Sequence, residues 1–307
     1  MTSSDRAALE RSLAKAYPYN EVFFGDLPLR ERLKKRPFTV LFVALGRRLL
    51  SFLVYDLKVL PEFFRVKTFF GETVLNKMPA GFVVWWYGFL EGWELPLASC
   101  IVKHVGPGDT FFDVGANDGY FTLLAARLVG DEGHVHAFEP SPNGYGRLAP
   151  FVAGRKNITL KQEALLDRSG EVSFTYFGNA APGSSSVLPL AEMLRARPEL
   201  ARAGGVTIPV KATTIDEYVE QGNIKPRFLQ MDTEGTELRV LRGAARTLAA
   251  HKPMVAIELL DSTVKAGKYA ETVEFMRQFG YRPHNLTRRG DITPVLDKPA
   301  SATIIFT

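Results

Sequence analysis

Cysteine and histidine are scarce in this 307-residue chain, which has one cysteine and five histidines. A single cysteine excludes an intramolecular disulfide and any metal site built from several thiolates. Cys100 lies in the apolar segment 97–102, so we expect a buried core thiol rather than a nucleophile. The histidines and carboxylates also lack the spacing of a zinc-protease motif, and we predict no metal site.

A strong charge of either sign is also missing. The 38 basic and 33 acidic residues leave a net charge of +5, too small for this length to indicate a nucleic-acid partner. Hydrophobic residues make up 46% of the chain, which excludes disorder of the whole chain and is ordinary for a globular protein. The first residues contain no apolar signal core, so we expect a cytoplasmic protein.

The sequence has no apolar run of the ~20 residues that a membrane-spanning helix needs. The apolar region 37–55 is divided by Arg47 and Arg48, each of which would cost ~3 kcal/mol at the bilayer centre. A basic cluster precedes this region and consists of Arg30, Arg32, Lys34, Lys35 and Arg36. We prefer helices packed on the core or on a second subunit, which would make a homo-oligomer. The alternative is an interfacial helix with a basic rim at a membrane surface.

The chain divides into an N-terminal extension, 1–92, and a second domain, 93–307. The extension is predicted to be helical first and then, over 61–92, rich in aromatic residues that suggest short strands or a ribbon covering a pocket. The aromatic stretch 83–93 suggests a pocket for a partly apolar or sugar-like ligand, or equally plain core. In the second domain strands alternate with helices, which predicts an α/β fold with a mostly parallel sheet and helices on both faces. Strands are expected near 110–114, 134–139, 158–162, 171–177, 206–211, 226–231, 253–259, 280–284 and 302–306. Helices are expected over 94–105, 119–129, 141–151, 214–220, 236–249 and 264–279. The long insertion 179–205 is typical of a lid or substrate loop.

A glycine turn follows the first strand of this domain. Gly115 permits a sharp turn, but Asn117 stands where a dinucleotide motif has its second glycine, so a pyrophosphate is disfavoured here. Asp113 at the strand end would attract an ammonium group, and Glu139 at the end of the next strand would bind ribose hydroxyls. An amine, a ribose and no phosphate together describe S-adenosylmethionine. Glu163 would accept a hydrogen bond from the exocyclic amine of adenine or simply face solvent, and both interpretations stay open.

Several segments in the right order resemble the FkbM-type S-adenosylmethionine-dependent methyltransferases. They are 113–120 (DVGANDGY), 138–140 (FEP), 163–170 with 172–174, 213–216, 232–237 with 240–243, and 252–253 leading to Glu258. The resemblance extends from about residue 85 to the end of the chain. It implies a class I methyltransferase (Rossmann-like) fold with a seven-stranded sheet. It also implies methyl transfer, usually to a hydroxyl of a small-molecule acceptor such as a sugar, a glycolipid or a polyketide-like natural product.

The resemblance also indicates which residues hold the cofactor. Trp93 and Glu94 look like the family's aromatic–Glu pair, which closes the cofactor end of the pocket. One departure is Gln230, at a position where such proteins often have lysine. The complete set of predicted cofactor-binding residues is Glu94, Asp113, Gly115, Ala116, Asn117, Gly119, Tyr120, Glu139, Pro140, Glu163, Ala164 and Asp232.

Methyl transfer to a hydroxyl gains ~10²–10⁴-fold from a general base. We expect Asp232 or Glu234 to be that base or to orient it, with Glu258 at the end of the fifth parallel strand as a second candidate. Glu234 could instead be a carboxylate that a helix N-terminus favours, and His284 is a further candidate base. Two other functions stay open: a nicotinamide-dependent oxidoreductase and a non-catalytic Rossmann-like binding protein.

Overall fold

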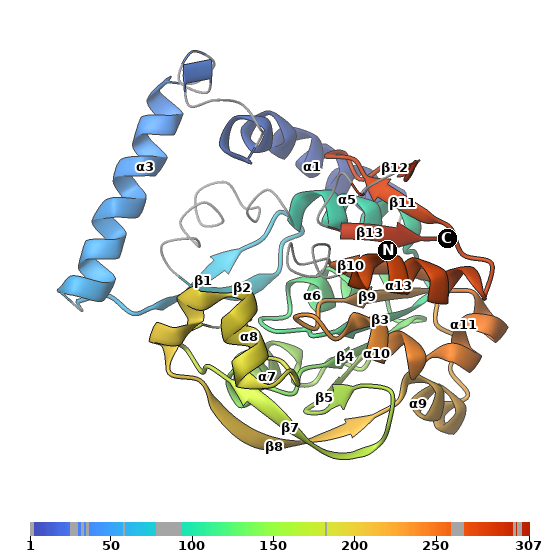
Figure 1. The fold of residues 1–307 in the computed structure, drawn as a ribbon. Coiled ribbons are helices and arrows are strands. Elements are labelled where there is room, and N and C mark those ends of the chain that lie inside the picture. The colour runs from blue at the N-terminus through green and yellow to red at the C-terminus, as the bar shows by residue number, and fades with distance from the viewer. Residues whose placement is uncertain are drawn as a thin grey trace. The chain divides into compact units, whose positions relative to one another are not determined.

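The computed structural model describes residues 3–24, 30–31, 34, 37–57, 59–77, 94–181, 183–258, 267–296, 299 and 303–307. The chain divides into two compact units. Figure 1 shows its helices and strands coloured by residue number. Unit 1 comprises Met1–His104 with Thr287–Asp291, and unit 2 comprises Val105–Leu286 with Ile292–Thr307. The predicted domain boundary at 92/93 lies outside the described residues, as does the aromatic stretch 83–93.

Unit 1 contains three α-helices, a π-helical turn and a β-hairpin among its described residues. These elements are α1 (Ser3–Phe24), α3 (Pro37–Ser51), η1 (Phe52–Asp56), β1 (Phe63–Lys67), β2 (Thr73–Lys77) and α5 (Glu94–His104). The Tyr17 hydroxyl of α1 donates a hydrogen bond to Ser99 Oγ of α5 at 3.0 Å. Cys100 is fully buried, and burial raises the pKa of its thiol to about 12. The expectation of an inert core thiol is therefore confirmed.

Unit 2 is built around a mostly parallel sheet with the order β12-β11-β13-β10-β9-β3-β4-β5. Its strands are β3 (Thr110–Val114), β4 (His134–Phe138), β5 (Ile158–Lys161), β9 (Phe228–Met231), β10 (Met254–Glu258), β11 (Pro283–Leu286), β12 (Ile292–Pro294) and β13 (Thr303–Phe306). Five neighbouring strands of this sheet run parallel, in the order β10-β9-β3-β4-β5. Strand β13 runs antiparallel to β10 and β11. The sheet has eight strands, so the predicted count of seven is wrong. The short edge strand β12 pairs with β11 over only three positions and carries no apolar run that would reveal it in the sequence.

The helices of unit 2 follow the predicted alternation. They are α6 (Tyr120–Val129), α7 (Pro142–Val152), α9 (Ile215–Gly222), α10 (Glu237–Arg242), α11 (Ala245–His251) and α13 (Lys268–Arg277). The single helix predicted over 236–249 is divided at Gly243. A Cβ at Gly243 would lie 1.9 Å from the carbonyl oxygen of Leu166, so the backbone comes closer here than any side chain would allow.

Two strands predicted from the alternating pattern, 171–177 and 206–211, do not join the large sheet. They form β7 (Gly170–Tyr176) and β8 (Val206–Thr213), which pair antiparallel over seven positions in a separate sheet of order β6-β8-β7 with β6 (Ala164–Leu165). Antiparallel neighbours need no helical crossover. The insertion between β7 and β8 instead holds α8 (Leu190–Ala196) and the 3₁₀ helix η2 (Pro198–Ala203), around a small core of Phe177, Met193 and Leu200.

The core of unit 2 lies along the central strands. Phe112, Leu229, Val255 and Ile304 come from four neighbouring strands and are fully buried in one cluster. The predicted α/β fold is therefore confirmed. In the part of the chain that the structure describes, no helix combines the length and apolar character needed to cross a bilayer.

Candidate functional site

A cavity opens at the carboxyl ends of β3, β4 and β9. From β3 the chain proceeds to β4 and β5 on one side, and β9 lies on the other side of β3, so the strand order reverses between β3 and β9. Open α/β sheets bind their ligands at such a switch point. The cavity is lined by Val114, Gly115, Asn117, Phe138, Glu139, Pro140, Ser141, Glu163, Ala164, Leu165, Leu166, Phe174, Gly183, Ser185, Ser186, Val187, Asp232, Thr233, Glu234 and Thr236.

The turn after β3 is in backbone contact with the turn after β9. The Asp232 N–H donates a hydrogen bond to the Val114 carbonyl at 2.9 Å. A Cβ at Gly115, where φ is +87°, would lie 1.9 Å from the backbone oxygen of Asp232. Only glycine fits this position, because any side chain would separate the two turns.

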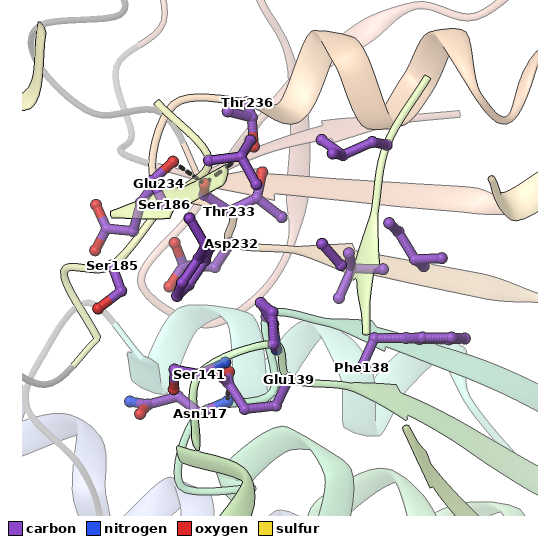
Figure 2. Close-up of a pocket in the computed structure, with 18 of the residues that line it drawn as sticks. Asn117, Phe138, Glu139, Ser141, Ser185, Ser186, Asp232, Thr233, Glu234 and Thr236 are labelled. Carbon is purple, nitrogen blue, oxygen red and sulfur yellow. Dashed lines mark hydrogen bonds between the residues drawn. The ribbon is translucent and has the colours of Figure 1, made fainter. Parts of the chain in front are cut away.

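Glu139 is held in place at the end of β4. Its two carboxylate oxygens accept hydrogen bonds from the N–H groups of Asn117 and Ser141, each at 2.8 Å. Figure 2 shows Asn117, Glu139 and Ser141 together on one side of the cavity. Burial raises the pKa of Glu139, whereas these hydrogen bonds oppose the rise. Each carboxylate oxygen has a second lone pair, so Glu139 can still accept hydrogen bonds from a ligand in the cavity.

Arg147 on α7 braces the glycine turn, a role that the sequence did not reveal. Its guanidinium forms an ion pair with Asp118 and donates to Asn117 Oδ1 at 3.0 Å. This contact supports Asn117 in its left-handed conformation, with φ at 45°. An arginine in an amphipathic helix is usually interpreted as a solvent-exposed side chain. No sequence spacing links Arg147 to the glycine turn, so its contact could not be predicted.

Asp113 does not line the cavity. It is 1% exposed and accepts a hydrogen bond from the Thr122 hydroxyl of α6. Burial raises the pKa of Asp113 to about 7. Gln230 is its registered neighbour on β9, and its buried Oε1 has no hydrogen-bond partner among the described residues. The structure therefore places Asp113 in the interior, whereas the sequence analysis placed it against a ligand's ammonium group.

Three further predicted residues shape the turn without lining the cavity: Ala116, Gly119 and Tyr120. The Ala116 N–H donates to the Phe138 carbonyl at 3.0 Å. Gly119 caps α6 with φ at 80°, and a Cβ there would lie 2.1 Å from a methyl carbon of Leu148. Tyr120 is the buried first residue of α6.

An apolar wall continues from β4 to the small sheet. Ala164 and Leu165 of β6, together with Phe174 of β7, are buried and line the cavity. Glu163 and Pro140 also line it. An apolar wall with the carboxylate of Glu163 beside it suits an aromatic base that carries an amine.

The acidic turn after β9 forms the opposite wall, with Asp232, Thr233 and Glu234 facing the side that holds Glu139 (Figure 2). Glu237 at the start of α10 fixes this turn. Its Oε1 accepts hydrogen bonds from the N–H groups of Thr233 at 3.2 Å and Gly235 at 3.0 Å. Glu237 therefore occupies the helix-terminal position that the sequence analysis considered for Glu234.

Glu234 has an unusual backbone and an unusual environment. Its φ is 57°, in the left-handed region that non-glycine residues rarely adopt. The carboxylate lies 3.1 Å from Nη2 of Arg197 in the insertion. Burial raises the pKa of Glu234 to about 7, with Glu258 and Glu237 adding repulsion and Arg197 opposing it.

Glu258 at the end of β10 belongs to the same acidic cluster, although it does not line the cavity. Burial and the nearby charge of Glu237 raise its pKa, and a side-chain hydrogen bond with Asp232 lowers it. The structure therefore brings together all three predicted catalytic residues, Asp232, Glu234 and Glu258.

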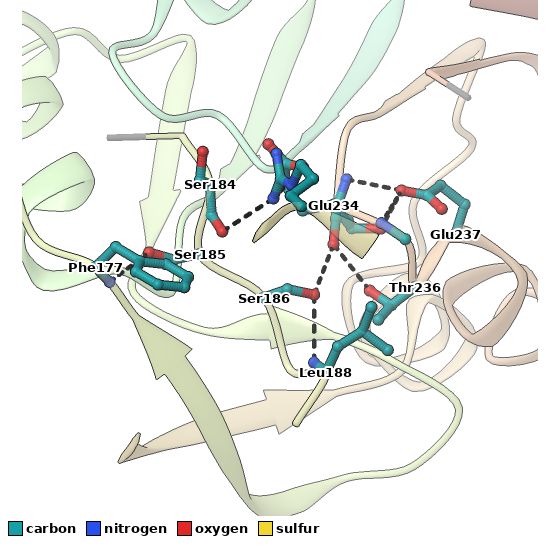
Figure 3. A network of polar contacts seen from close by, with 11 residues as sticks. Phe177, Ser184, Ser185, Ser186, Leu188, Glu234, Thr236 and Glu237 are labelled. Carbon is teal, nitrogen blue, oxygen red and sulfur yellow. Dashed lines mark hydrogen bonds and ion pairs between the residues drawn. The ribbon is translucent and has the colours of Figure 1, made fainter. Parts of the chain in front are cut away.

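The insertion contributes a further wall that sequence patterns identified only as a loop. Ser186 and Thr175 exchange backbone hydrogen bonds at 2.7 and 3.0 Å, and the Ser186 hydroxyl donates to the Thr233 carbonyl at 3.2 Å. Arg197 also donates to the Ser184 carbonyl at 3.3 Å. Figure 3 shows this network joining the loop residues Ser184 and Ser186 to Glu234, Thr236 and Glu237.

Two predictions fall on other parts of the chain. Trp93 lies outside the described residues, and Glu94 begins α5 in unit 1, so its role at the cofactor remains a prediction. His284 on β11 is absent from the cavity lining. Within the described ranges, no group of three or more histidine, cysteine or carboxylate side chains could hold a metal ion.

Comparison with known proteins identifies a matching domain family and similar methyltransferases. Residues 113–283 match the Methyltransferase FkbM domain. The 31-O-demethyl-FK506 methyltransferase FkbM of Streptomyces tacrolimicus is 30% identical over 214 residues, which cover 59% of this chain and 77% of that protein. The hexuronic acid methyltransferase AglP of Haloferax volcanii is 28% identical over 167 residues, covering 54% of this chain and 62% of that protein. This second match therefore spans less than two thirds of the length of AglP.

Among solved structures, a methyltransferase FkbM from Methylobacillus flagellatus is 18% identical, with 65% of this chain and 43% of that chain covered at a TM-score of 0.41. The domain match and the methyltransferase relatives confirm the predicted function class and its cofactor, S-adenosylmethionine. This chain belongs to the FkbM methyltransferase family.

Proposed function

We propose that this protein is an O-methyltransferase that acts on a hydroxyl of a sugar, a glycolipid or a polyketide-like natural product. One observation carries the proposal: a buried carboxylate suited to ribose, Glu139, faces a cluster of carboxyl groups across a single cavity. The names of two relatives agree with this acceptor class, since one acts on a hexuronic acid and the other on a demethylated FK506 oxygen.

The first task of the chain is to hold the methyl donor. The fit rests on Glu139, whose free lone pairs can accept hydrogen bonds from two ribose hydroxyls, and on the apolar wall of Ala164, Leu165 and Phe174 for the base. The glycine turn contributes Gly115 and Asn117 to the same wall. When bound, S-adenosylmethionine supplies an electrophilic methyl group on a sulfonium.

The second task is to accept the proton of the acceptor hydroxyl. We assign this role to Glu234, because it lines the cavity and its pKa of about 7 suits a base that works near neutral pH. Asp232 also lines the cavity, and its hydrogen bond with Glu258 fixes its direction. Asp232 would therefore orient the acceptor hydroxyl toward the methyl group. Alignment of donor and acceptor contributes several further kcal/mol.

The experiment is a screen of sugars, glycolipids and polyketides with radiolabelled S-adenosylmethionine, followed by kinetics of two variants. We expect both Glu234→Gln and Asp232→Asn to lose about 10²-fold or more in turnover, and Glu234→Gln to bind the donor normally. The matched control is Glu274→Gln, an exposed carboxylate on α13 that should leave turnover unchanged. Near-normal turnover in both site variants would remove the acid–base assignment.

A further inference from the structure

Helix α3 presents an apolar face to solvent. Four of its side chains, together with the first residue of η1, carry large exposed fractions: Phe38 86%, Leu41 56%, Leu45 58%, Leu49 59% and Phe52 47%. At 3.6 residues per turn these positions fall within an arc of about 80°. Single exposed apolar residues are ordinary, but a continuous stripe marks a surface that another body covers.

The other side of this segment is turned inward. Val54 in η1 is 3% exposed, and Leu50 and Leu53 are half-buried. The segment around η1 therefore has side chains turned away from solvent as well as the exposed stripe.

Charge indicates what covers the stripe. Residues 32–55 contain six basic residues and no acidic residue. Arg48 is exposed and lies about 20° beyond Leu41 on the rim of the stripe. Arg30 and Lys34, just before α3, are exposed as well. Two acidic residues flank this region, since Glu31 pairs with Lys34 at 2.8 Å and the exposed Asp56 ends η1. An apolar stripe with a mostly cationic border is complementary to anionic lipid headgroups above an acyl boundary.

We propose that α3 and η1 bind the surface of an anionic lipid bilayer, with the stripe from Phe38 to Phe52 inserted at the headgroup boundary. The helix lies along the membrane and does not cross it, in agreement with the absence of a spanning helix among the described residues. A second copy of the chain fits less well, because a two-fold contact on this stripe would bring the two cationic borders together. This observation favours the interfacial alternative over the packed helices that the sequence analysis preferred.

The test is sedimentation of the full chain with phosphatidylcholine vesicles that contain or lack phosphatidylglycerol, at low and high salt. We expect binding only to the anionic vesicles, and weaker binding at high salt because of screening. The double variant Leu41→Glu/Leu45→Glu should lower partitioning about tenfold or more, since two apolar side chains no longer insert. Its melting temperature should stay unchanged because both side chains are already exposed.

Matched controls separate this surface from a general effect of charge. Leu296→Glu alters a leucine that is 90% exposed in unit 2 and should bind vesicles like the unaltered chain. Arg48→Gln should weaken binding about fivefold, whereas Arg246→Gln on α11 should not. Equal binding to neutral and anionic vesicles, or unaltered binding by the double variant, would overturn the proposal. So would a chain that binds no vesicles but changes from dimer to monomer in the double variant.

Discussion

The Glu139 carboxylate accepts hydrogen bonds from two backbone N–H groups and still faces the cavity, where we propose that it binds the cofactor ribose. Glu139→Gln replaces one accepting oxygen with an amide that cannot accept the N–H bond. We expect S-adenosylmethionine affinity to fall about 10- to 100-fold, the range for a lost hydrogen bond to a charged group. Calorimetric titration of the variant measures this change. The exposed Glu171→Gln is the control, and unaltered affinity in Glu139→Gln would contradict the ribose assignment.

Gly115 tests the contact between the two turns. Gly115→Ala places a Cβ 1.9 Å from a backbone oxygen, so we expect a loss of about 3 kcal/mol or more in the free energy of unfolding. Gly108 has a similar φ of +82° but no heavy atom within 4 Å of an added Cβ. Gly108→Ala should therefore cost only the ~1–2 kcal/mol of its left-handed backbone. Denaturant unfolding measures the free energy of unfolding of both variants. Equal losses in Gly115→Ala and Gly108→Ala would argue against the close approach of the two turns at Gly115.

Asp113 makes stability depend on pH. Its pKa rises from 3.8 unfolded to about 7 folded, so the folded state binds its proton more tightly. The protonated Asp113 side chain therefore makes its full contribution to the stability of the folded state below about pH 4, and this contribution is lost as pH rises to about 7. Asp113→Asn stays neutral and keeps an acceptor for Thr122. Without cofactor, this variant should match the unaltered chain at pH 4 and exceed it at pH 8, by up to about 4 kcal/mol.

Thermal or denaturant unfolding at several pH values measures this difference. The exposed Asp131→Asn should show no such pH dependence. An Asp113→Asn chain that is less stable than the unaltered chain at pH 8 would mean that Asp113 works as an ionised group.

Some residues of the candidate site could be predicted from the sequence and others could not. Gly115, Asn117 and Glu139 follow strands whose apolar patterns are clear, so their place at the sheet edge could be predicted. Arg147 and Arg197 could not be predicted, because each reaches the site from a helix or an insertion and its partner is distant in the chain. The interior position of Asp113 depends on Thr122 and on the depth of the turn, which no pattern encodes.

At the scale of elements, the insertion between β7 and β8 contacts the acidic turn through the ion pair between Arg197 and Glu234. In the unaltered enzyme, turnover should rise with pH through about 7 as Glu234 loses its proton. Arg197 lowers the pKa of Glu234, so Arg197→Gln should move this rise to higher pH. The neighbouring Arg195→Gln removes an exposed arginine of the same insertion and should leave the profile in place. The pH dependence of kcat/KM in each variant measures this shift. A rise at the same pH in Arg197→Gln as in the unaltered enzyme would contradict the assignment of Glu234 as the base.

The elements themselves were mostly predictable, because apolar strands alternate with amphipathic helices from Thr110 onward. The partners of β7 and β8 were not, since an alternating pattern identifies a strand but not the sheet that it joins. The division of 236–249 into α10 and α11 depends on the close approach of Leu166 to Gly243, a contact between distant segments. The edge strand β12 is too short to show a period.

At the scale of the whole molecule, each unit supports a separate claim. Unit 2 carries the methyltransferase family match and the cavity at the switch point. Unit 1 carries the stripe on α3, whose apolar residues are evident in the sequence, although the sequence does not show which side of the helix is exposed. Packing decides that question, and the same apolar residues would suit a core, a dimer contact or a lipid surface.

The central claim is that the cavity at the ends of β3, β4 and β9 holds S-adenosylmethionine. Its most direct test is calorimetric titration of the full chain with S-adenosylmethionine and, in parallel, with NAD. We predict saturable binding of S-adenosylmethionine at a single site and no heat of binding with NAD, because the turn at Asn117 has no cradle for a pyrophosphate. Binding of NAD without binding of S-adenosylmethionine would contradict the claim.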